Sequence, residues 1–240
     1  MPRLFALADL HLSLTGAKPM DVFGEAWRGH ASRMADAWDG LVAAEDTVLL
    51  PGDLSWAGDL VEAGPDLAWI GARPGGKILL RGNHDSWWTG ATRVRAALPA
   101  GCVILQNDAH VASARIVVGA RGWTSPNDPE ATEHDAAIFR REIERLRLSV
   151  ADADRRFGRN LPRVAMLHFP PWIEGRPATE VVGILRDAAV RDCVYGHLHG
   201  ADVALGVTGE RDGIRFHLVS ADAAGFVPVP IPPPREAGVE

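Results

Sequence analysis

The segment KILLRGNHD, residues 77–85, joins a short apolar run to a turn that carries an asparagine, a histidine and an aspartate. Four other apolar runs of similar length are followed in the same way by carboxylates or histidines. Short runs of this kind, bounded by glycine or proline, are typical of strands in a sheet that is covered on both faces. The five predicted strands are Leu4–Ala8, Thr47–Leu50, Lys77–Leu80, Val164–Leu167 and Asp192–Tyr195.

The polar residues after these runs share one position, the end of a predicted strand. They are Asp9 and His11, Asp53, Asn83 with His84 and Asp85, His168, and His197 with His199. In open α/β sheets, ligand sites form just beyond the carboxyl ends of the strands. We therefore expect these side chains to meet in one site.

The residue types in this set suit divalent metal ions. An ion of borderline hardness accepts carboxylate oxygen and imidazole nitrogen together. Asp9 and His11 are two residues apart, so on a continuing strand they would share one face and hold one ion. Asp53 follows a glycine, so it can turn sharply and bridge two ions with its two oxygens, while Asn83 offers a carbonyl oxygen.

Two such ions about 3.5–4 Å apart form a clamp for in-line displacement at phosphorus. They lower the pKa of a bound water toward about 7 and neutralise the oxygens on which charge builds. The pattern thus predicts a binuclear hydrolase of phosphate mono- or diesters, in which a metal-bound hydroxide attacks phosphorus in line.

The ordered pattern Asp-x-His, Gly-Asp, Gly-Asn-His-Asp, His, Gly-His-x-His resembles the calcineurin-like metallophosphoesterases. The resemblance runs from Asp9 to His199, and every motif ligand is present. It implies an α/β fold in which two mixed β-sheets form a sandwich flanked by helices, with the layer order αββα. It also implies a small bacterial phosphohydrolase of loosely defined substrate.

The resemblance assigns a role to each motif residue. Asp53 would bridge the two ions, and Asp85 would have a structural role on its turn. His84 would not be a ligand but would act on the leaving oxygen, as a general acid or as a donor in the transition state. The first ion would be held by Asp9, His11 and His199, and the second by Asn83, His168 and His197.

The residues after Asp53 narrow the substrate class. They are Leu54-Ser55-Trp56-Ala57-Gly58, whereas phosphoprotein phosphatases of this superfamily have an Asp-Arg-Gly whose arginine binds phosphate. A protein phosphatase is therefore not expected. Two alternatives stay open: a metal-dependent nuclease, and a non-catalytic interaction protein on the same fold. Manganese is the first choice of metal, with iron and zinc as alternatives.

Aromatic residues follow the metal-binding segments and predict a substrate pocket. Trp56, Trp87, Trp88 and Trp172 each lie three to five residues after a motif residue, so we expect at least two of them to line the entrance. The alternative is that they pad a loop-rich surface. Arg121 is a candidate hydrogen-bond donor to the substrate phosphate, and the alternative is a structural role.

Composition agrees with a globular enzyme. The net charge of −6 over 240 residues argues against a nucleic-acid partner and leaves a small phosphorylated substrate, with nucleotides among the candidates. No apolar run approaches the ~20 residues that span a bilayer, and no export leader is visible, so we expect a cytoplasmic protein. Cys102 and Cys193 are expected to be buried free thiols. The oligomeric state is left open.

The remaining pattern predicts one domain over residues 1–227, followed by a proline-rich tail over 228–240. Five prolines in Val227–Pro234 favour an extended chain, and the last few residues are expected to be disordered. Two strands, Cys102–Gln106 and His110–Gly119, would be joined by a turn at Asn107-Asp108, and Ile214–Val219 would be the final strand. The predicted helices are Asp21–Val42, a stretch around Asp59–Gly71 interrupted by Pro65, Thr89–Leu98, Glu130–Phe157 and Thr179–Ala189.

Overall fold

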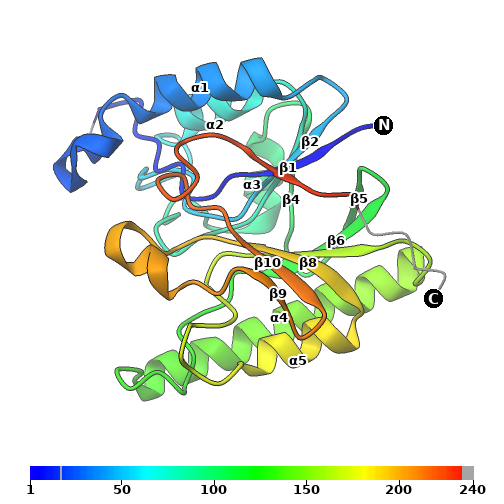
Figure 1. Cartoon of the computed structure of the whole chain (residues 1–240). Helices are drawn as coiled ribbons and strands as arrows, with labels where there is room; N and C mark the ends of the chain where they lie inside the picture. The colour runs from blue at the N-terminus through cyan, green and yellow to red at the C-terminus, as the bar shows by residue number, and fades with distance from the viewer. Residues whose placement is uncertain (17, 234–240) are drawn as a thin grey trace.

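Two β-sheets pack face to face between two layers of helices in the computed structural model, which describes residues 1–16 and 18–233 (Figure 1). The expected αββα sandwich of mixed sheets is confirmed. The first sheet has the order β11-β1-β2-β3-β4, and the second has the order β5-β6-β7-β8-β10-β9. Helices α1 and α2 lie outside the first sheet, while α4 and α5 lie outside the second (Figure 1).

The strands of the first sheet are β1 (Leu4–Ala6), β2 (Thr47–Leu50), β3 (Gly76–Leu79), β4 (Cys102–Ile104) and β11 (Val229–Ile231). Those of the second are β5 (His110–Ala112), β6 (Arg115–Ala120), β7 (Arg163–Leu167), β8 (Val190–Tyr195), β9 (Gly209–Arg211) and β10 (Ile214–Leu218). The helices are α1 (His30–Leu41), α2 (Gly64–Ala72), α3 (Ala91–Ala97), α4 (Glu133–Phe157) and α5 (Glu180–Asp187), with 3₁₀ turns η1 (Met20–Phe23), η2 (Glu25–Trp27) and η3 (Gly200–Leu205).

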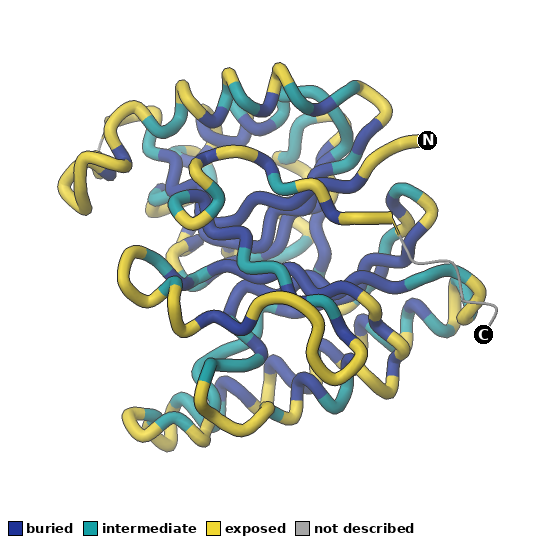
Figure 2. The backbone as a smooth tube through the Cα atoms, in the orientation of Figure 1, coloured by how far each residue is buried: buried dark blue, intermediate teal, exposed yellow. Residues whose placement is uncertain are grey.

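The central strands are parallel and buried on both faces, which is why they read as continuous apolar runs. Leu49 of β2 and Val117, Met166 and Val194 of the second sheet are fully buried and belong to the core cluster between the two sheets. The centre of the molecule is accordingly the most buried part of the tube in Figure 2. Parallel strands align their carboxyl ends, so the loops that follow them gather at one edge of the sandwich.

The predicted helix Asp21–Val42 is confirmed only in its second half. Before α1 the chain makes two short 3₁₀ turns, because Gly24 and Gly29 take positive φ angles of 130° and 61° that break a helix. Pro65 was expected to interrupt a helix, but it lies in the first turn of α2, where its missing N–H costs nothing.

The predicted strand His110–Gly119 is wrong as one element. It is divided into β5 and β6 by a tight turn at Ser113 and Ala114, whose φ angles are 47° and 57°. The turn at Asn107-Asp108 does not form a hairpin either, since β4 and β5 lie in different sheets. Helix α4 agrees closely with its prediction and starts with a capping box between Thr132 and Asp135.

The predicted final strand, Ile214–Val219, is followed by one more strand, β11. Residues 229–231 are extended as predicted, but they pair antiparallel with β1, with Pro230 opposite Phe5. A proline fits there because β11 is an edge strand. The boundary at residue 227 therefore leaves one strand of the first sheet in the predicted tail. Residues 234–240, where disorder was predicted, lie outside the described residues.

Both cysteines are buried and unpaired, as predicted. Among the described residues, no helix combines the length and the apolar character that crossing a membrane requires.

Candidate metal centre

Both sheets contribute side chains to a single site. Asp9, His11, Asp53 and Asn83 follow β1, β2 and β3 of the first sheet, and His168, His197 and His199 follow β7 and β8 of the second. The described residues form two groups with metal-ligand geometry, in each of which the ligand atoms lie within 4.8 Å of one another. These groups are Asp9 with His11 and His199, and Asp53 with His168 and His197.

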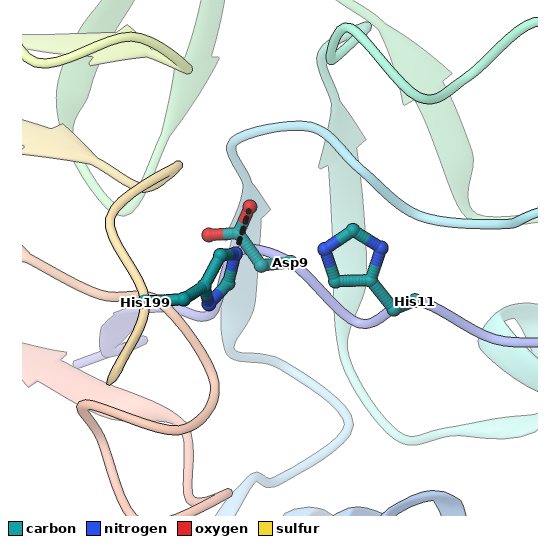
Figure 3. Close-up of side chains that lie close together, drawn as sticks. All are labelled: Asp9, His11 and His199. Atoms are coloured by element: carbon teal, nitrogen blue, oxygen red, sulfur yellow. Dashed lines mark ion pairs between the residues drawn. The ribbon is translucent and has the colours of Figure 1, made fainter. Parts of the chain in front are cut away.

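Figure 3 shows the first group. Asp9 and His11 come from the segment after β1, while His199 reaches across from the loop after β8. The Asp9 carboxylate lies beside the His199 ring, and its Oδ1 is 3.5 Å from His199 Nε2.

The backbone at these ligands is strained rather than extended. β1 ends at Ala6, and Asp9 and His11 take left-handed φ angles of 59° and 43°, so the expected alternation along a continuing strand is wrong. Asp53 and His197 are also left-handed, at 52° and 74°. Such conformations cost about 1–3 kcal/mol each outside glycine and concentrate at functional sites.

Hydrogen bonds between the loops keep these conformations in place. The N–H of Asp9 donates to the carbonyl of Gly52 at 2.9 Å, and the N–H of His11 donates to the carbonyl of Asp53 at the same distance. The N–H of His197 donates to Asp9 Oδ2 at 2.9 Å. The first two bonds join loops of the first sheet, and the third joins the two sheets.

The motif glycines allow close approach as well as turning. A Cβ at Gly82 would lie 2.0 Å from Asp53 Oδ1, and one at Gly196 would lie 2.3 Å from Asp9 Oδ2. Any side chain at either position would displace a carboxylate of the site.

Asp53 lies between the two groups. Its Oδ2 is 3.9 Å from His11 Nε2 and 3.4 Å from His168 Nε2. Its Oδ1 accepts a hydrogen bond from the N–H of His84 at 2.8 Å. A single oxygen therefore faces both groups, whereas the sequence suggested that both oxygens would.

Asn83 and His84 take different positions beside Asp53. Asn83 Oδ1 lies 2.7 Å from His168 Nε2, so it belongs to the second group. His84 is exposed, and its ring centre lies 5.7 Å from that of His11. This placement leaves the His84 imidazole at the open side of the site.

Two imidazoles are oriented through their second ring nitrogen. His168 Nδ1 lies 2.9 Å from the carbonyl oxygen of Pro51, and His199 Nδ1 lies 2.8 Å from Asp222 Oδ1. Each contact leaves Nε2 directed at the site, which is the usual way that a metal-binding histidine is held. Asp222 was missed by the sequence analysis, although it follows β10, the parallel neighbour of β8. The strand-end rule applied to that strand would have found it.

Asp85 organises the turn beneath the site. Its buried carboxylate accepts five hydrogen bonds, from the N–H groups of Gly82, Asp53, Leu54 and Ser55 and from Trp87 Nε1. Burial, and then the neighbouring Asp53, raise the pKa of Asp85 to about 6. These contacts confirm the structural role expected for Asp85.

The charges of the site are balanced by two protonated imidazoles. Burial disfavours charge on His168, but Asp53 beside it raises its pKa to about 9. Burial likewise opposes charge on His199, while the carboxylates of Asp222 and Asp9 beside it raise its pKa to about 10. Burial lowers the pKa of both His11 and His197 to about 4.

The carboxylates show the complementary shift. Burial opposes their ionisation, but the histidines nearby hold the pKa values of Asp9 and Asp53 below the ordinary range. The neighbouring imidazoles thus favour the ionised form of both carboxylates.

The residues fit two divalent cations. Asp9 Oδ1 is buried and has no hydrogen-bond partner among the described residues. The candidate ligand atoms are carboxylate and amide oxygens and imidazole nitrogens, a combination that suits a borderline divalent ion. Such ions would supply the positive charge that two imidazolium groups supply without them.

Of the tryptophans predicted at the entrance, Trp56 contacts the site. Its ring stacks on His11 at 4.9 Å and lies 4.4 Å from His84. Trp87 and Trp88 are buried in the core of the first layer, so their predicted place at the entrance is wrong. Trp172 packs against the core of the other layer, and its Nε1 donates to the carbonyl of Arg176.

Two further aromatic contacts bear on the site. Trp27, which the sequence analysis did not select, packs edge-on against His11 and His199. Arg121 was predicted to donate hydrogen bonds to phosphate. Its Nη2 lies 3.2 Å from Glu142 Oε1, and its Cζ lies 4.4 Å from the centre of the Trp123 ring. Glu142 and Trp123 hold the Arg121 guanidinium in place, and among the described residues it makes no hydrogen bond to either ligand group.

A groove of about 730 Å³ reaches the second ligand group at His197. Its walls come from the loops before α4, after β7 and after β8. Apolar side chains and carboxylates share the lining, which includes Trp123, Phe169, Ile173, Leu198, Asp128, Glu130, Asp135 and Asp202.

Curated relatives match only part of this chain. The gene 66 proteins of Mycobacterium phages L5 and D29 are 34% and 35% identical to it over 85 residues. That segment is 35% of this chain and 41% of each phage protein.

Solved structures match along nearly the whole length. A phosphopantetheinyl hydrolase from Mycobacterium tuberculosis superposes with a TM-score of 0.59 at 17% identity, covering 99% of this chain and 98% of that one. A protein of unknown function from Aquifex aeolicus gives a TM-score of 0.51 at 14% identity, covering 96% of both chains. At these identities the likeness is one of fold.

The family model for calcineurin-like phosphoesterases matches residues 2–201. This range contains β1 through β8 and all seven strand-end ligands. The sequence pattern, the sandwich and the paired ligand groups agree with that match, and the chain belongs to the calcineurin-like phosphoesterase family.

Proposed function

We propose that this protein is a hydrolase of phosphate mono- or diesters that works with two divalent metal ions. The observation that carries the proposal is the position of Asp53 Oδ2, within 3.9 Å of His11 Nε2 in one ligand group and 3.4 Å of His168 Nε2 in the other. A carboxylate oxygen shared in this way is what a bridge between two ions requires.

The ligand assignment follows the two groups. Asp9, His11 and His199 would hold one ion, and Asn83, His168 and His197 the other, with Asp53 shared. When bound, the ions would polarise the phosphoryl oxygens and acidify the attacking water. Manganese stays the predicted metal, and the cytoplasmic location also stays a prediction.

The chain's own residues would do the remaining work. His84 is exposed at the open side of the site, and its backbone is fixed by Asp53, so its imidazole can donate a proton to the leaving oxygen. Trp56 covers one side of His84 and His11, which limits water there and offers a flat face to an aromatic ring of a substrate.

The groove beside His197 is the candidate site for the rest of the substrate. Its volume of about 730 Å³ lies in the usual range for small-molecule pockets. Three carboxylates line the groove besides Asp128, which pairs with Arg176, and they would repel a nucleic-acid backbone that carries a phosphate at every step. A small substrate whose phosphate lies at the metal centre would place its uncharged part here. The similarity to a phosphopantetheinyl hydrolase adds that substrate class to the compounds worth testing.

A metal-dependent assay tests this function. We expect the protein to hydrolyse p-nitrophenyl phosphate or its bis ester in the presence of manganese, iron or zinc. A screen of nucleotides, cyclic nucleotides, sugar phosphates and phosphopantetheinyl compounds would then identify the substrate class. His84→Ala should keep both ions and lose about 10²–10⁴-fold in kcat. His134→Ala, an exposed histidine on α4, is the matched control. A metal-loaded His84→Ala protein with full turnover would exclude the role given to His84.

A further inference from the structure

A second cavity lies beside the metal centre and has a different chemistry. Its volume is about 170 Å³, and it is lined by residues from the ends of β3, β4 and β6, from the segment before α3 and from α4. None of the seven ligand residues lines it, and neither does His84. At about 30 Å³ for each water molecule, it has room for a group the size of a phosphate.

Three arginines and one glutamate line this cavity. Glu142 is buried, and its Oε1 accepts hydrogen bonds from Arg121 Nη2 at 3.2 Å and Arg145 Nη1 at 3.0 Å. Arg81 makes no hydrogen bond and no ion pair with any residue that the structure describes. With Arg81, Arg121 and Arg145 against Glu142, the wall carries three positive charges and one negative, a net charge of +2.

The unmet hydrogen-bonding capacity of the wall is mainly that of donors. Arg81 Nε and Arg121 Nε are buried without an acceptor, whereas Glu142 Oε2 is the one buried acceptor of this wall without a donor among the described residues. Burial lowers the pKa of the Arg121 guanidinium, and the nearby Arg81 and Arg145 lower it further. Arg121 and Arg145 share one oxygen of Glu142, and the two buried Nε–H groups without an acceptor are costly unless an anion accepts from them.

We propose that this cavity is a second anion-binding site, which takes a phosphate-sized oxyanion on Arg81, Arg121 and Arg145. The planar fork of a guanidinium matches the oxygens of phosphate, and two or three forks converging on one group give both strength and orientation. Glu142 fixes two of the three forks, so that the site exists before the anion binds.

The cavity is joined to the metal centre through the backbone. Arg81 lies two residues before Asn83, and the carbonyl of Arg121 accepts hydrogen bonds from the N–H groups of His168 and Phe169 at 3.0 and 2.9 Å. The anion has two sources with this chemistry: a free oxyanion, or a second phosphate group of the substrate. The second source rests on the phosphoesterase activity proposed above.

Anomalous scattering from tungstate, a phosphate analogue, locates the site in crystals of the metal-loaded chain. We expect a peak among the three guanidinium groups, apart from any peak at the metals. Arg81→Gln should remove the cavity peak, whereas Arg140→Gln, an exposed arginine on α4, should keep it. Tungstate at the metals alone, or a cavity peak that persists in Arg81→Gln, would overturn the proposal.

Calorimetric titration with inorganic phosphate tests the same site in solution. Arg81→Gln should weaken the cavity binding event by about tenfold to a hundredfold, the usual effect of losing one charge-assisted partner. Identical isotherms for the wild type and this variant would count against the site.

Kinetics then separate the two sources. For each protein, kcat/KM is measured for adenosine 3′,5′-bisphosphate and for p-nitrophenyl phosphate. The quantity compared is kcat/KM for the bisphosphate divided by kcat/KM for p-nitrophenyl phosphate. If Arg81→Gln lowers this ratio about tenfold, the cavity binds a second phosphate of the substrate. An unchanged ratio, with the tungstate peak lost, assigns it to a free anion. If no substrate turns over, the phosphoesterase proposal fails while the crystal and calorimetric results still decide the anion site.

Discussion

The substitution Asp85→Asn tests how much the hydrogen bonds accepted by the Asp85 carboxylate stabilise the candidate metal centre. The Asp85 carboxylate accepts three hydrogen bonds through Oδ1 and two through Oδ2. The two donors on Oδ2 are the N–H groups of Gly82 and Asp53, at 2.7 and 2.9 Å. Both belong to the segments that carry the shared carboxylate and Asn83, so this one side chain joins two of the five ligand loops.

The expected cost follows from the loss of one acceptor. Asparagine keeps an oxygen for the three donors on Oδ1, but its NH₂ group then faces the N–H groups of Gly82 and Asp53. Each buried donor left without an acceptor costs about 1–3 kcal/mol, so the lost hydrogen bonds should lower the free energy of unfolding by about 2–6 kcal/mol. Part of this loss is offset, because asparagine removes a buried charge that Asp53 repels. The opposite rotamer leaves three donors unpaired and is worse.

Urea denaturation of the metal-depleted chain at pH 8 measures this cost, since there the wild-type carboxylate is ionised. Metal content after purification gives the second readout, which should fall because Asp53 loses its support. Asp59→Asn is the matched control: Asp59 is exposed, and its Oδ1 accepts from the N–H groups of Val61 and Glu62, a contact that asparagine can keep. It should stay within about 0.5 kcal/mol of wild type. An Asp85→Asn protein equally stable and fully loaded would refute the reasoning.

Three further outcomes are expected. Asp222→Ala frees the ring of His199 and should weaken metal binding about 10–100-fold in a chelator competition, with unchanged affinity as the contrary result. Gly82→Ala places a Cβ 2.0 Å from Asp53 Oδ1 and should abolish metal retention by elemental analysis, whereas Gly183→Ala, with open space around it, should not. Because the pKa values of His168 and His199 are raised to about 9 and 10, both are protonated at pH 7 without metal, so calorimetry in buffers of different ionisation enthalpy should show about two protons released on metal binding.

The sign of the pH dependence follows from the same shifts. A histidine whose folded pKa is raised stabilises the metal-free fold below its ordinary value of 6.5, and that contribution is lost as pH rises through 9 to 10. Metal affinity changes in the opposite direction, increasing with pH over that range, because the cation competes with the proton for His168 and His199.

The sequence predicted which side chains gather in the two groups, because it shows where each buried strand ends. A strand that is buried on both faces is visible as an apolar run, and the residues that follow it must emerge at the sheet edge. The partners of those ligands are a different matter. Asp222 lies 23 residues from His199, and only the parallel pairing of β8 with β10 brings the two together.

The sequence position of the tryptophans also did not predict the direction in which their side chains point. Trp56 and Trp87 both follow a ligand loop by a few residues, yet one stacks on His11 and the other is wholly buried beneath Asp85. Their indole N–H groups have different partners: that of Trp87 donates to the buried carboxylate of Asp85, and that of Trp56 donates to Met20 Sδ.

The division of ligands between the sheets explains why the site tolerates strained backbone. In the first group, Asp9 and His11 come from the first sheet and His199 from the second. In the second group, Asp53 comes from the first sheet, while His168 and His197 come from the second. Each ion would therefore bind side chains from both layers.

Left-handed conformations at four of these residues oppose folding by several kcal/mol in total. A cation that binds the folded chain and not the unfolded one stabilises it by mass action, and here that gain arises only when the two sheets are docked. The strain and the metal affinity are thus two aspects of one arrangement. The loops are held in strained conformations, and those conformations direct candidate ligand atoms from two sheets toward one another.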